Sequence, residues 1–200
     1  MKNNEINIRI ATVNDAEKLL KIYTPYVEQT AITFEYDVPS IEEFTDRIRN
    51  VLEKYPYLVA EQDSEILGYA YVSSFKSRAA YAWGVETSIY VEQQVKKKGI
   101  GGKLHHALEA IMKEQGILNM NACIAYPTEE DEYLTKNSVE FHAHLGYRLV
   151  GEFQQCGYKF DRWYNMVWME KLIGEHHQGQ AAPKTFDEIR DIIKEKYGME

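Results

Sequence analysis

The feature that most constrains this chain is a glycine-rich turn between an apolar strand and a helix, in the segment SIYVEQQVKKKGIGGKLHHALEAI (residues 88–111). Glycines let a backbone approach a ligand closely, and the unpaired N–H groups at a helix start, with the helix dipole, favour an anion. Positive charge is concentrated here by Lys96, Lys97, Lys98 and Lys103. The pattern predicts a phosphate cradle; the alternative is a plain strand-to-helix turn with a solvated charge run.

Two common phosphate-binding motifs do not fit this turn. A P-loop ends in Gly-Lys-Ser/Thr, but Gly102-Lys103 is followed by Leu104, and no earlier glycine stands at the required spacing. The dinucleotide fingerprint needs a third glycine three residues after the second, and that position is also Leu104. The cradle is therefore neither a P-loop nor a dinucleotide-binding turn.

Length and composition indicate one globular domain, with room for an appendage. The chain has 200 residues, 44% of them hydrophobic, which is ordinary globular usage. Its net charge of −8 argues against nucleic acid as the main partner, because nucleic-acid binding needs a basic footprint. No stretch approaches the roughly 18 apolar residues of a membrane span, and the first ten residues lack the apolar core of a signal peptide. We expect a soluble cytoplasmic protein with neither a nucleic-acid nor a membrane partner.

The cysteines and histidines do not form a metal-binding pattern. Cys123 and Cys156 are too few for a disulfide scaffold and lie in no metal-type pair, so we expect reduced thiols. The adjacent pairs His105-His106 and His176-His177 are expected to be surface residues rather than ligands. We therefore expect no metal.

Hydrophobic periodicity predicts a mixed α/β domain with one central sheet. Alternating apolar residues from Ile6 to Ile10 are typical of a half-buried strand. A helix is expected to begin at Ser40, where Glu43 would complete a capping box. The expected elements, in order, are a strand (6–10), a helix (16–27), a strand or extended loop (30–38), a helix (40–52), a hairpin (57–75), a strand (81–91), a helix (99–115), a strand (118–126), a short helix (137–145) and two strands that are joined near Asp161 and end at Leu172.

Residues 174–200 are expected to be an appendage to a domain of residues 1–173. The appendage starts with the polar stretch GEHHQGQAAPK, which is typical of a linker. An amphipathic helix should follow, with Thr185 and Glu188 spaced as a capping box. Its apolar face would consist of Phe186, Ile189, Ile193 and Tyr197. So short a helix is not stable alone, so we expect it to dock on the domain or on a second subunit.

Several segments resemble one enzyme family. Lys96-x-x-Gly99-x-Gly101 after an apolar strand resembles the acetyl-CoA signature Gln/Arg-x-x-Gly-x-Gly/Ala of the GNAT N-acetyltransferases, with Lys where Gln or Arg is usual. NSVEFHAHLGYRLVG resembles the late helix of that family. The phosphinothricin and methionine-sulfoximine N-acetyltransferase branch shares the blocks TFEY, KYPYLVAE, GYAYVSSFKSRAAYAW, ETSIYV and FHAHLGY. The resemblance covers about residues 6–172, and the departures are the acidic insertion TEEDEYLTK and the tail.

The resemblance implies a fold, a reaction and a partner. The fold would be the GNAT fold, a mixed, mostly antiparallel sheet flanked by helices. The reaction would be direct transfer of acetyl from acetyl-CoA to the primary amine of a small amino-acid-like substrate, of the phosphinothricin, methionine sulfone or methionine sulfoximine type. Together with the unpartnered tail helix, the branch also implies a homodimer.

Two residues are implied to act in catalysis. An amine attacks only when it is neutral, so the site must remove a proton, a step typically worth about 10²–10⁴-fold. Glu86 aligns with the proposed base of the branch; the alternative is a solvated glutamate at a strand end. His142 stands where many relatives have a tyrosine that protonates the leaving thiolate, and it could supply that proton or assist the base. The alternative is that His142 is a helix histidine near the core, with its hydrogen bonds made within the protein. His144, two residues further along the helix, points in a different direction.

The remaining site residues are implied to bind the two substrates. Backbone groups of Ile89, Tyr90 and Val91 would pair with pantetheine as an added strand does. The pyrophosphate would be held by N–H groups of Lys97, Lys98, Gly99, Ile100, Gly101 and Gly102, and Asn137 could bind CoA further out. Lys76 and Arg78 could pair with an acceptor carboxylate, and Phe34, Tyr81 and Trp83 could line its pocket, each also being compatible with a plain core or surface role.

Other functions remain open on the sequence. A CoA-binding or sensory module without catalysis would keep the glycine turn but would not need Glu86 or His142. A polyamine acceptor would want an acidic pocket, to which TEEDE could contribute, whereas Lys76 and Arg78 argue the other way. A protein N-terminus is a further possible acceptor.

Overall fold

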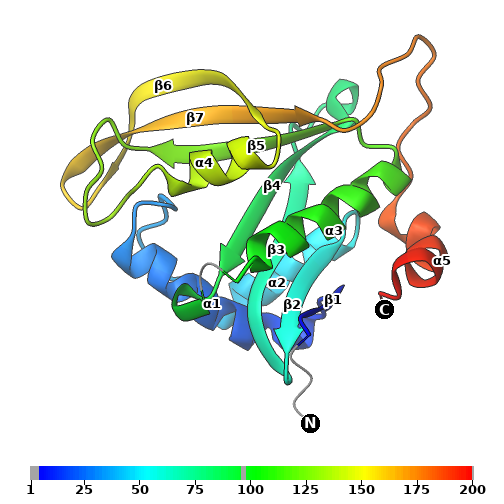
Figure 1. The fold of residues 1–200 in the computed structure, drawn as a ribbon, viewed down its shortest axis with the longest axis horizontal. Coiled ribbons are helices and arrows are strands. Elements are labelled where there is room, and N and C mark those ends of the chain that lie inside the picture. Colours follow the sequence, from blue (N-terminus) through cyan, green and yellow to red (C-terminus); the bar gives the residue numbers. More distant parts are fainter. Residues whose placement is uncertain (1–4, 96–97, 200) are drawn as a thin grey trace.

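The computed structural model describes residues 5–95 and 98–199. Within this part of the chain, seven strands form one sheet in the order β1-β2-β3-β4-β5-β7-β6, with α3 and α4 on one face and α1 and α2 on the other (Figure 1). Neighbouring strands are antiparallel except β4 and β5, which are parallel. The predicted mixed, mostly antiparallel sheet is confirmed. The elements are β1 (Asn7–Ile10), α1 (Ala16–Gln29), α2 (Ile41–Leu52), β2 (Tyr57–Gln62), β3 (Glu65–Ser74), β4 (Gly84–Val91), α3 (Ile100–Gln115), β5 (Asn119–Tyr126), α4 (Asn137–His144), β6 (Arg148–Lys159), β7 (Arg162–Leu172) and α5 (Phe186–Tyr197).

Two local predictions need correction. The strand expected from Tyr81 begins at Gly84, because a short 3₁₀ turn ends at Tyr81. Ser40 caps α2 by accepting from the N–H of Glu43 (3.1 Å). The Glu43 carboxylate does not reach back to complete the capping box, because it accepts from Arg47 one turn further along the helix (2.6 Å).

Two hydrophobic cores hold the helices to the sheet. One lies under α3, where Leu108 and Met120 are fully buried. The other lies under α1 and α2 and is rich in tyrosine, with ring pairs such as Tyr23–Tyr90 at 4.9 Å between centroids. Aromatic rings bring large apolar area to a core and gain further from edge-to-face contact, so many of the tyrosines serve packing rather than a pocket.

The tail docks on the domain, which was one of the two expected positions. Helix α5 packs on α3 (Figure 1), and Phe186 and Ile189 are buried in the α3 core. Thr185 and Glu188 form the predicted capping box. In the described part of the chain, no helix has both the length and the apolar character that a bilayer crossing requires.

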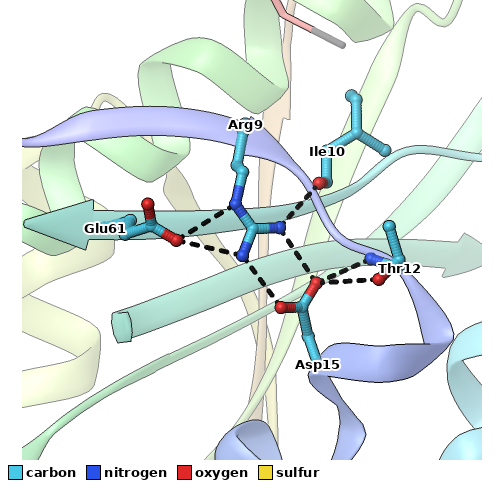
Figure 2. A network of polar contacts seen from close by, with 5 residues as sticks. All are labelled: Arg9, Ile10, Thr12, Asp15 and Glu61. Carbon is cyan, nitrogen blue, oxygen red and sulfur yellow. Dashed lines mark hydrogen bonds and ion pairs between the residues drawn. The ribbon is translucent and has the colours of Figure 1, made fainter. Parts of the chain in front are cut away.

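A half-buried ion cluster fastens β1 to the rest of the domain (Figure 2). The Arg9 guanidinium donates to both oxygens of Asp15 (2.8 and 2.9 Å) and to Glu61 on β2 (3.1 and 3.2 Å). Burial raises the pKa of Asp15, but hydrogen bonds from Arg9 and Thr12 outweigh it and leave the pKa below its ordinary value. The cluster therefore fixes the start of α1, which borders the site described next.

Candidate active site

Strands β4 and β5 are paired only at their beginnings and then separate. Glu86 and Asn121 form the last cross-strand pair. The Thr87 hydroxyl donates to the Asn121 carbonyl (3.1 Å), and Asn121 Nδ2 donates to the Val85 carbonyl (3.1 Å). Beyond this point the two strands diverge (Figure 1). The sheet therefore contains a fork, and Glu86 lies at its apex.

A cavity of about 350 Å³ lies beyond the apex, between β4, the glycine turn and α4; we call it the fork cavity. It brings together most of the residues expected to bind the cofactor, and His142. These predicted residues are Ile89, Val91, Gly99, Ile100, Gly101, Gly102, Asn137 and His142. The other lining residues were not predicted from the sequence, and they are Tyr26, Ile32, Val95, Thr135, Ser138 and Phe141. Lys98 is exposed beside the turn, and Lys97 lies outside the described residues.

The glycine turn is an open helix start. Gly99 has a φ of +72°, in the left-handed region that glycine adopts without strain, and it caps α3 without a side chain. The Lys103 N–H donates to the Gly99 carbonyl (3.0 Å), so the N–H groups before it are the unpaired first-turn donors of a helix. A Cβ added at Gly99 or Gly102 would meet no heavy atom within 4 Å, whereas one at Gly101 would lie 3.2 Å from Phe141 Cζ. The turn therefore fits a phosphate group, which needs backbone donors and open space.

The outer part of β4 offers fewer backbone groups to a ligand than predicted. Alternate residues of an antiparallel strand turn their N–H and C=O to the same partner, and the N–H of Glu92 donates to β3 (2.8 Å). Tyr90 therefore also faces β3, while Ile89 and Val91 face the fork. The Tyr26 hydroxyl donates to the Val91 carbonyl (2.5 Å) and accepts from the Val91 N–H (3.3 Å). Of the three predicted residues, Ile89 is the one placed to pair with a ligand.

Glu86 is half-buried and has the electrostatic surroundings of a proton acceptor. Burial raises the pKa of Glu86, and the positive charge of Lys76 opposes that shift. A carboxylate with a raised pKa accepts a proton more readily than an ordinary one. Cys123 is exposed on one side, but desolvation of its thiol and the nearby charge of Glu86 raise the pKa of Cys123 to about 11. That thiol stays protonated at neutral pH and is therefore a poor nucleophile.

His142 is buried on α4 and has a defined tautomer. Its Nδ1 lies 2.7 Å from the Ser138 carbonyl oxygen, and because a carbonyl can only accept, Nδ1 carries the proton. Burial lowers the pKa of His142, while the Ser138 bond opposes this. The imidazole is therefore neutral at neutral pH, and its Nε2 is an acceptor. Of the two predicted roles, assisting the base fits this state better than protonating the thiolate. His144 is exposed and faces away.

A second cavity, of about 800 Å³, lies at the closed end of the fork; we call it the tail cavity. It is lined by Asn121, the cross-strand partner of Glu86, and by Lys76, whose charge acts on Glu86. Its volume is within the range of small-molecule sites, roughly 300–1,000 Å³. The predicted acceptor residues Lys76, Tyr81 and Trp83 come together here.

Three other residues lie away from where the sequence suggested. His105 is fully buried, not on the surface, and its Nε2 lies 2.9 Å from the Tyr147 hydroxyl. Arg78 is exposed at the start of the 3₁₀ turn, and Phe34 stacks on Tyr164 with ring centroids 6.5 Å apart. Among the residues described, no three His, Cys, Asp or Glu side chains are grouped as a metal ion would need.

The acidic insertion, residues 128–136, is folded onto β7. Arg162 pairs with Asp131 and with Glu132, each at 2.9 Å. Asp131 also accepts from the N–H of Leu134 (2.8 Å). At the end of the insertion, Thr135 lines the fork cavity. Two of its carboxylates are thus neutralised by an arginine instead of forming an open acidic pocket.

Known proteins resemble this chain in sequence and structure. The family described as "Acetyltransferase (GNAT) domain" matches residues 8–168. The phosphinothricin N-acetyltransferase of Streptomyces viridochromogenes is 30% identical over 166 residues, covering 83% of this chain and 87% of that protein. The L-methionine sulfoximine/L-methionine sulfone acetyltransferase of Pseudomonas aeruginosa is 33% identical over 169 residues, covering 82% and 92%. The crystal structure of a phosphinothricin acetyltransferase from Sinorhizobium meliloti in complex with AcCoA has a TM-score of 0.80 at 30% identity, covering 90% of this chain and 95% of that one.

These findings agree with the resemblance drawn from the glycine turn and the late helix. The fold as a whole corresponds to that solved structure over most of both chains. The match of the family pattern covers the glycine turn, α4 and both strands of the fork. The chain therefore belongs to the GNAT acetyltransferase family.

Proposed function

We propose that this protein transfers the acetyl group of acetyl-CoA to the α-amine of a small amino-acid-like acceptor, of the phosphinothricin, methionine sulfone or methionine sulfoximine type. The observation that carries the proposal is the position of Glu86 at the apex of the fork. The fork cavity lies on one side of it and the tail cavity, with Lys76, on the other. Glu86 itself lines neither cavity, and it is connected to the tail cavity by its cross-strand pair with Asn121 and by the charge of Lys76.

The fork cavity has the groups that would hold acetyl-CoA. The N–H groups of the turn from Gly99 to Gly102 would bind the pyrophosphate, and Lys98 would add positive charge. The backbone of Ile89 would pair with the pantetheine amides, and Asn137 lies at the rim for more distant contacts. Acetyl-CoA, when bound, supplies a thioester that is reactive toward a neutral amine.

Glu86 acts on the acceptor in this mechanism. Lys76 pairs with the acceptor carboxylate and so brings the α-ammonium toward the apex. Glu86 then accepts a proton from the ammonium, directly or through a water, which leaves the amine able to attack. His142 lines the fork cavity with its proton on Nδ1, so its Nε2 would accept a hydrogen bond there and support this proton transfer. In a ternary complex the amine nitrogen would bond to the acetyl carbon as the carbon–sulfur bond breaks, and the second proton lost from the nitrogen would neutralise the departing thiolate. No covalent acetyl-enzyme forms, in agreement with the protonated Cys123 thiol.

An amino-acid acceptor is favoured over a polyamine by the charges around the site. A polyamine needs open carboxylates, and Asp131 and Glu132 of the insertion are already paired with Arg162. The tail cavity is lined by Lys76 and by Glu170, but the Glu170 carboxylate is paired with Arg148, so the charge of Lys76 is left to repel a polycation. A CoA-binding module without catalysis would not need a half-buried glutamate at the apex.

We also propose that the protein is a cytoplasmic homodimer. Strand β6 is a long edge strand that is exposed along most of its length. It and β7 carry large exposed apolar side chains, including Leu149 (56% exposed), Phe153 (55%) and Trp163 (60%). Such an edge invites pairing with another chain, and a second copy would cover it. Sedimentation at micromolar concentration tests this, and the mass of a single chain would contradict it. The free thiols of Cys123 and Cys156 suit a reducing compartment.

A thiol-release assay with acetyl-CoA tests the activity. The acceptors are phosphinothricin, methionine sulfone, methionine sulfoximine, the common amino acids, spermidine and a short peptide. We expect turnover with the first three and little with spermidine. A preference for spermidine or for the peptide would contradict the acceptor class. Tight CoA binding without turnover on any acceptor would indicate a binding module.

A further inference from the structure

The tail cavity has a wall that lies outside the residues matched by the family. The match ends at residue 168, whereas His176, His177 and Gln180 line the cavity. We call these three residues the tail wall. The polar stretch that contains them is typical of a linker, so the wall is an unexpected part of the site.

The tail wall is held in place by specific backbone contacts on both sides. Before it, the N–H of Ile173 donates to the Leu118 carbonyl (2.8 Å). After it, the Trp83 indole N–H donates to the Ala181 carbonyl (2.8 Å), and Lys184 exchanges hydrogen bonds with Gln115 at 2.8 and 3.0 Å. A segment anchored in this way has a defined position, so its side chains can contribute to recognition.

Two carboxamides on the cavity are oriented by the tail. His176 Nε2 lies 2.8 Å from Asn119 Oδ1, and since an amide oxygen only accepts, Nε2 is the donor. The backbone N–H of His177 donates to Gln180 Oε1 (3.2 Å). With their oxygens engaged, Asn119 and Gln180 present their NH₂ groups as donors. The cavity therefore carries two oriented donor groups, together with the aromatic rings of Tyr81, Trp83 and Trp168.

The Asn119 donor lies at a defined spacing from Glu86. Asn119 is two residues before Asn121 on β5 and so shares its face of the sheet, about 7 Å away. Asn121 is opposite Glu86. An amino acid whose α-amine is at Glu86 would therefore place the end of a side chain of three to five atoms near Asn119, and Gln180 lines the same cavity.

We infer that the tail wall determines acceptor specificity: it recognises oxygen atoms at the far end of the acceptor side chain, such as those of a sulfone, sulfoximine or phosphinate. The aromatic rings contact the methylenes, and the NH₂ groups of Asn119 and Gln180 donate to the terminal oxygens. This inference rests on the proposed function, because it takes the tail cavity as the acceptor site. Asn119 and Gln180 would then distinguish an acceptor with terminal oxygens from an apolar acceptor of similar length.

The test compares two acceptors with side chains of similar length, methionine sulfone, which carries oxygens near its end, and norleucine, which ends in a methyl group. Gln180→Leu removes one donor, and His176→Leu releases Asn119. Gln178→Leu is the matched control, an exposed residue of the same segment outside the wall. We expect each wall variant to lower the ratio of kcat/KM for the sulfone over norleucine about tenfold, the effect of one lost hydrogen bond. The loss should appear in KM, and the control should keep the wild-type ratio.

A binding measurement separates failure of this inference from failure of the proposed function. Trp83 and Trp168 line the cavity, so quenching of tryptophan fluorescence by methionine sulfone, in the presence of CoA, reports occupancy without turnover. Wild-type quenching that weakens in Gln180→Leu supports the wall even if no acetyl is transferred, in which case only the proposed activity fails. Absence of wild-type quenching, or the same affinity and the same ratio in all variants, would overturn the inference.

Discussion

Glu86 and Asn121 are the last residues to face each other before β4 and β5 separate. This single pair sets the geometry of the site. On one side of it the sheet is continuous and carries the tail cavity, and on the other the fork opens onto the glycine turn. Glu86 lies in the strand between the two cavities, and Lys76 of the tail cavity acts on its pKa.

Removing the charge of Lys76 should shift the pH dependence of catalysis. Burial raises the pKa of Glu86, and Lys76 opposes the shift because a positive neighbour favours the carboxylate. In Lys76→Ala the pKa of Glu86 should rise further. The base must be deprotonated, so the acid limb of kcat/KM should move to higher pH. The pH–rate profile of the free enzyme measures this.

Arg78→Ala is the matched control, since Arg78 carries the same charge on the same loop but is not among the groups that act on Glu86. Ionisation of the acceptor is the same in every variant, so a difference in the acid limb reports on Glu86. If the acid limb of kcat/KM lies at the same pH in Lys76→Ala and Arg78→Ala, the charge of Lys76 does not set the pKa of Glu86.

Gly102→Glu should abolish acetyl-CoA binding and leave the fold intact. A Cβ at Gly102 meets no heavy atom within 4 Å, so the substitution has room in the free protein. The new side chain would occupy the cradle and repel the pyrophosphate. We expect an affinity loss of about 100-fold or more by calorimetry, equivalent to roughly 2.7 kcal/mol.

One variant controls for the added charge, and a second tests how closely the turn packs against Phe141. Gln178→Glu adds the same charge on the exposed tail and should bind CoA normally. Gly101→Ala places its Cβ 3.2 Å from Phe141 and should weaken binding by displacing that ring. Normal CoA affinity in Gly102→Glu would show that the cradle lies elsewhere.

Local sequence patterns predicted most of the fold, because periodicity and caps act over a few residues. Thr185 and Glu188 form their box as expected. His105 was misplaced because its partner, Tyr147, is 42 residues away. The residues that flank a helical histidine in the sequence do not show whether a distant hydroxyl will form a hydrogen bond with it in the core.

The same limit applies to the site. The glycine turn could be found because its residues are contiguous, whereas Tyr26 reaches Val91 across 65 positions. The tail wall was missed because a polar, glycine-containing stretch is typical of a linker, and only its contacts with Trp83 and Asn119 give it a fixed place. A sequence pattern thus predicts which backbone binds the cofactor better than which side chains select the acceptor.

Lys159 should be essential for stability, because it joins the β6–β7 hairpin to the end of α1 and the loop that follows. Its side chain is buried and donates to the carbonyls of Val27 (2.7 Å), Thr30 (2.9 Å) and Thr33 (2.8 Å). Lys159→Met would leave these acceptors without a donor. We expect the free energy of unfolding to fall by about 3 kcal/mol or more, as measured by urea denaturation. Lys18→Met, at an exposed position on α1, should stay within about 0.5 kcal/mol of wild type; equal midpoints for both variants would contradict the argument.

The tail helix should contribute to the stability of the whole domain. Phe186 is 1% exposed and belongs to the core under α3. Phe186→Ala should lower the free energy of unfolding by about 3–5 kcal/mol, the range for a buried aromatic residue. Thermal unfolding should show one transition, lowered by roughly 6–20 °C for a chain of this size. Glu195→Ala, on the exposed face of α5, is the control, and an unchanged transition in Phe186→Ala would mean that the helix is only loosely attached.

The proton path has two candidate residues, Glu86 and His142. Glu86→Gln keeps the shape of the side chain but cannot accept the proton. Its kcat should fall by the general-base factor, about 10²–10⁴, while acetyl-CoA affinity stays near wild type. Raising the pH should recover part of the loss, because more acceptor then arrives as the free amine.

His142→Ala should have a smaller effect, because the neutral imidazole, with its proton on Nδ1 toward Ser138, only accepts a hydrogen bond at Nε2. We expect a loss of about tenfold, comparable to one hydrogen bond, and no recovery at high pH. The measurement is a pH–rate profile of both variants beside the wild type, with CoA affinity as the control for folding. A near-normal rate in Glu86→Gln together with collapse in His142→Ala would reverse the assignment and make the histidine the base.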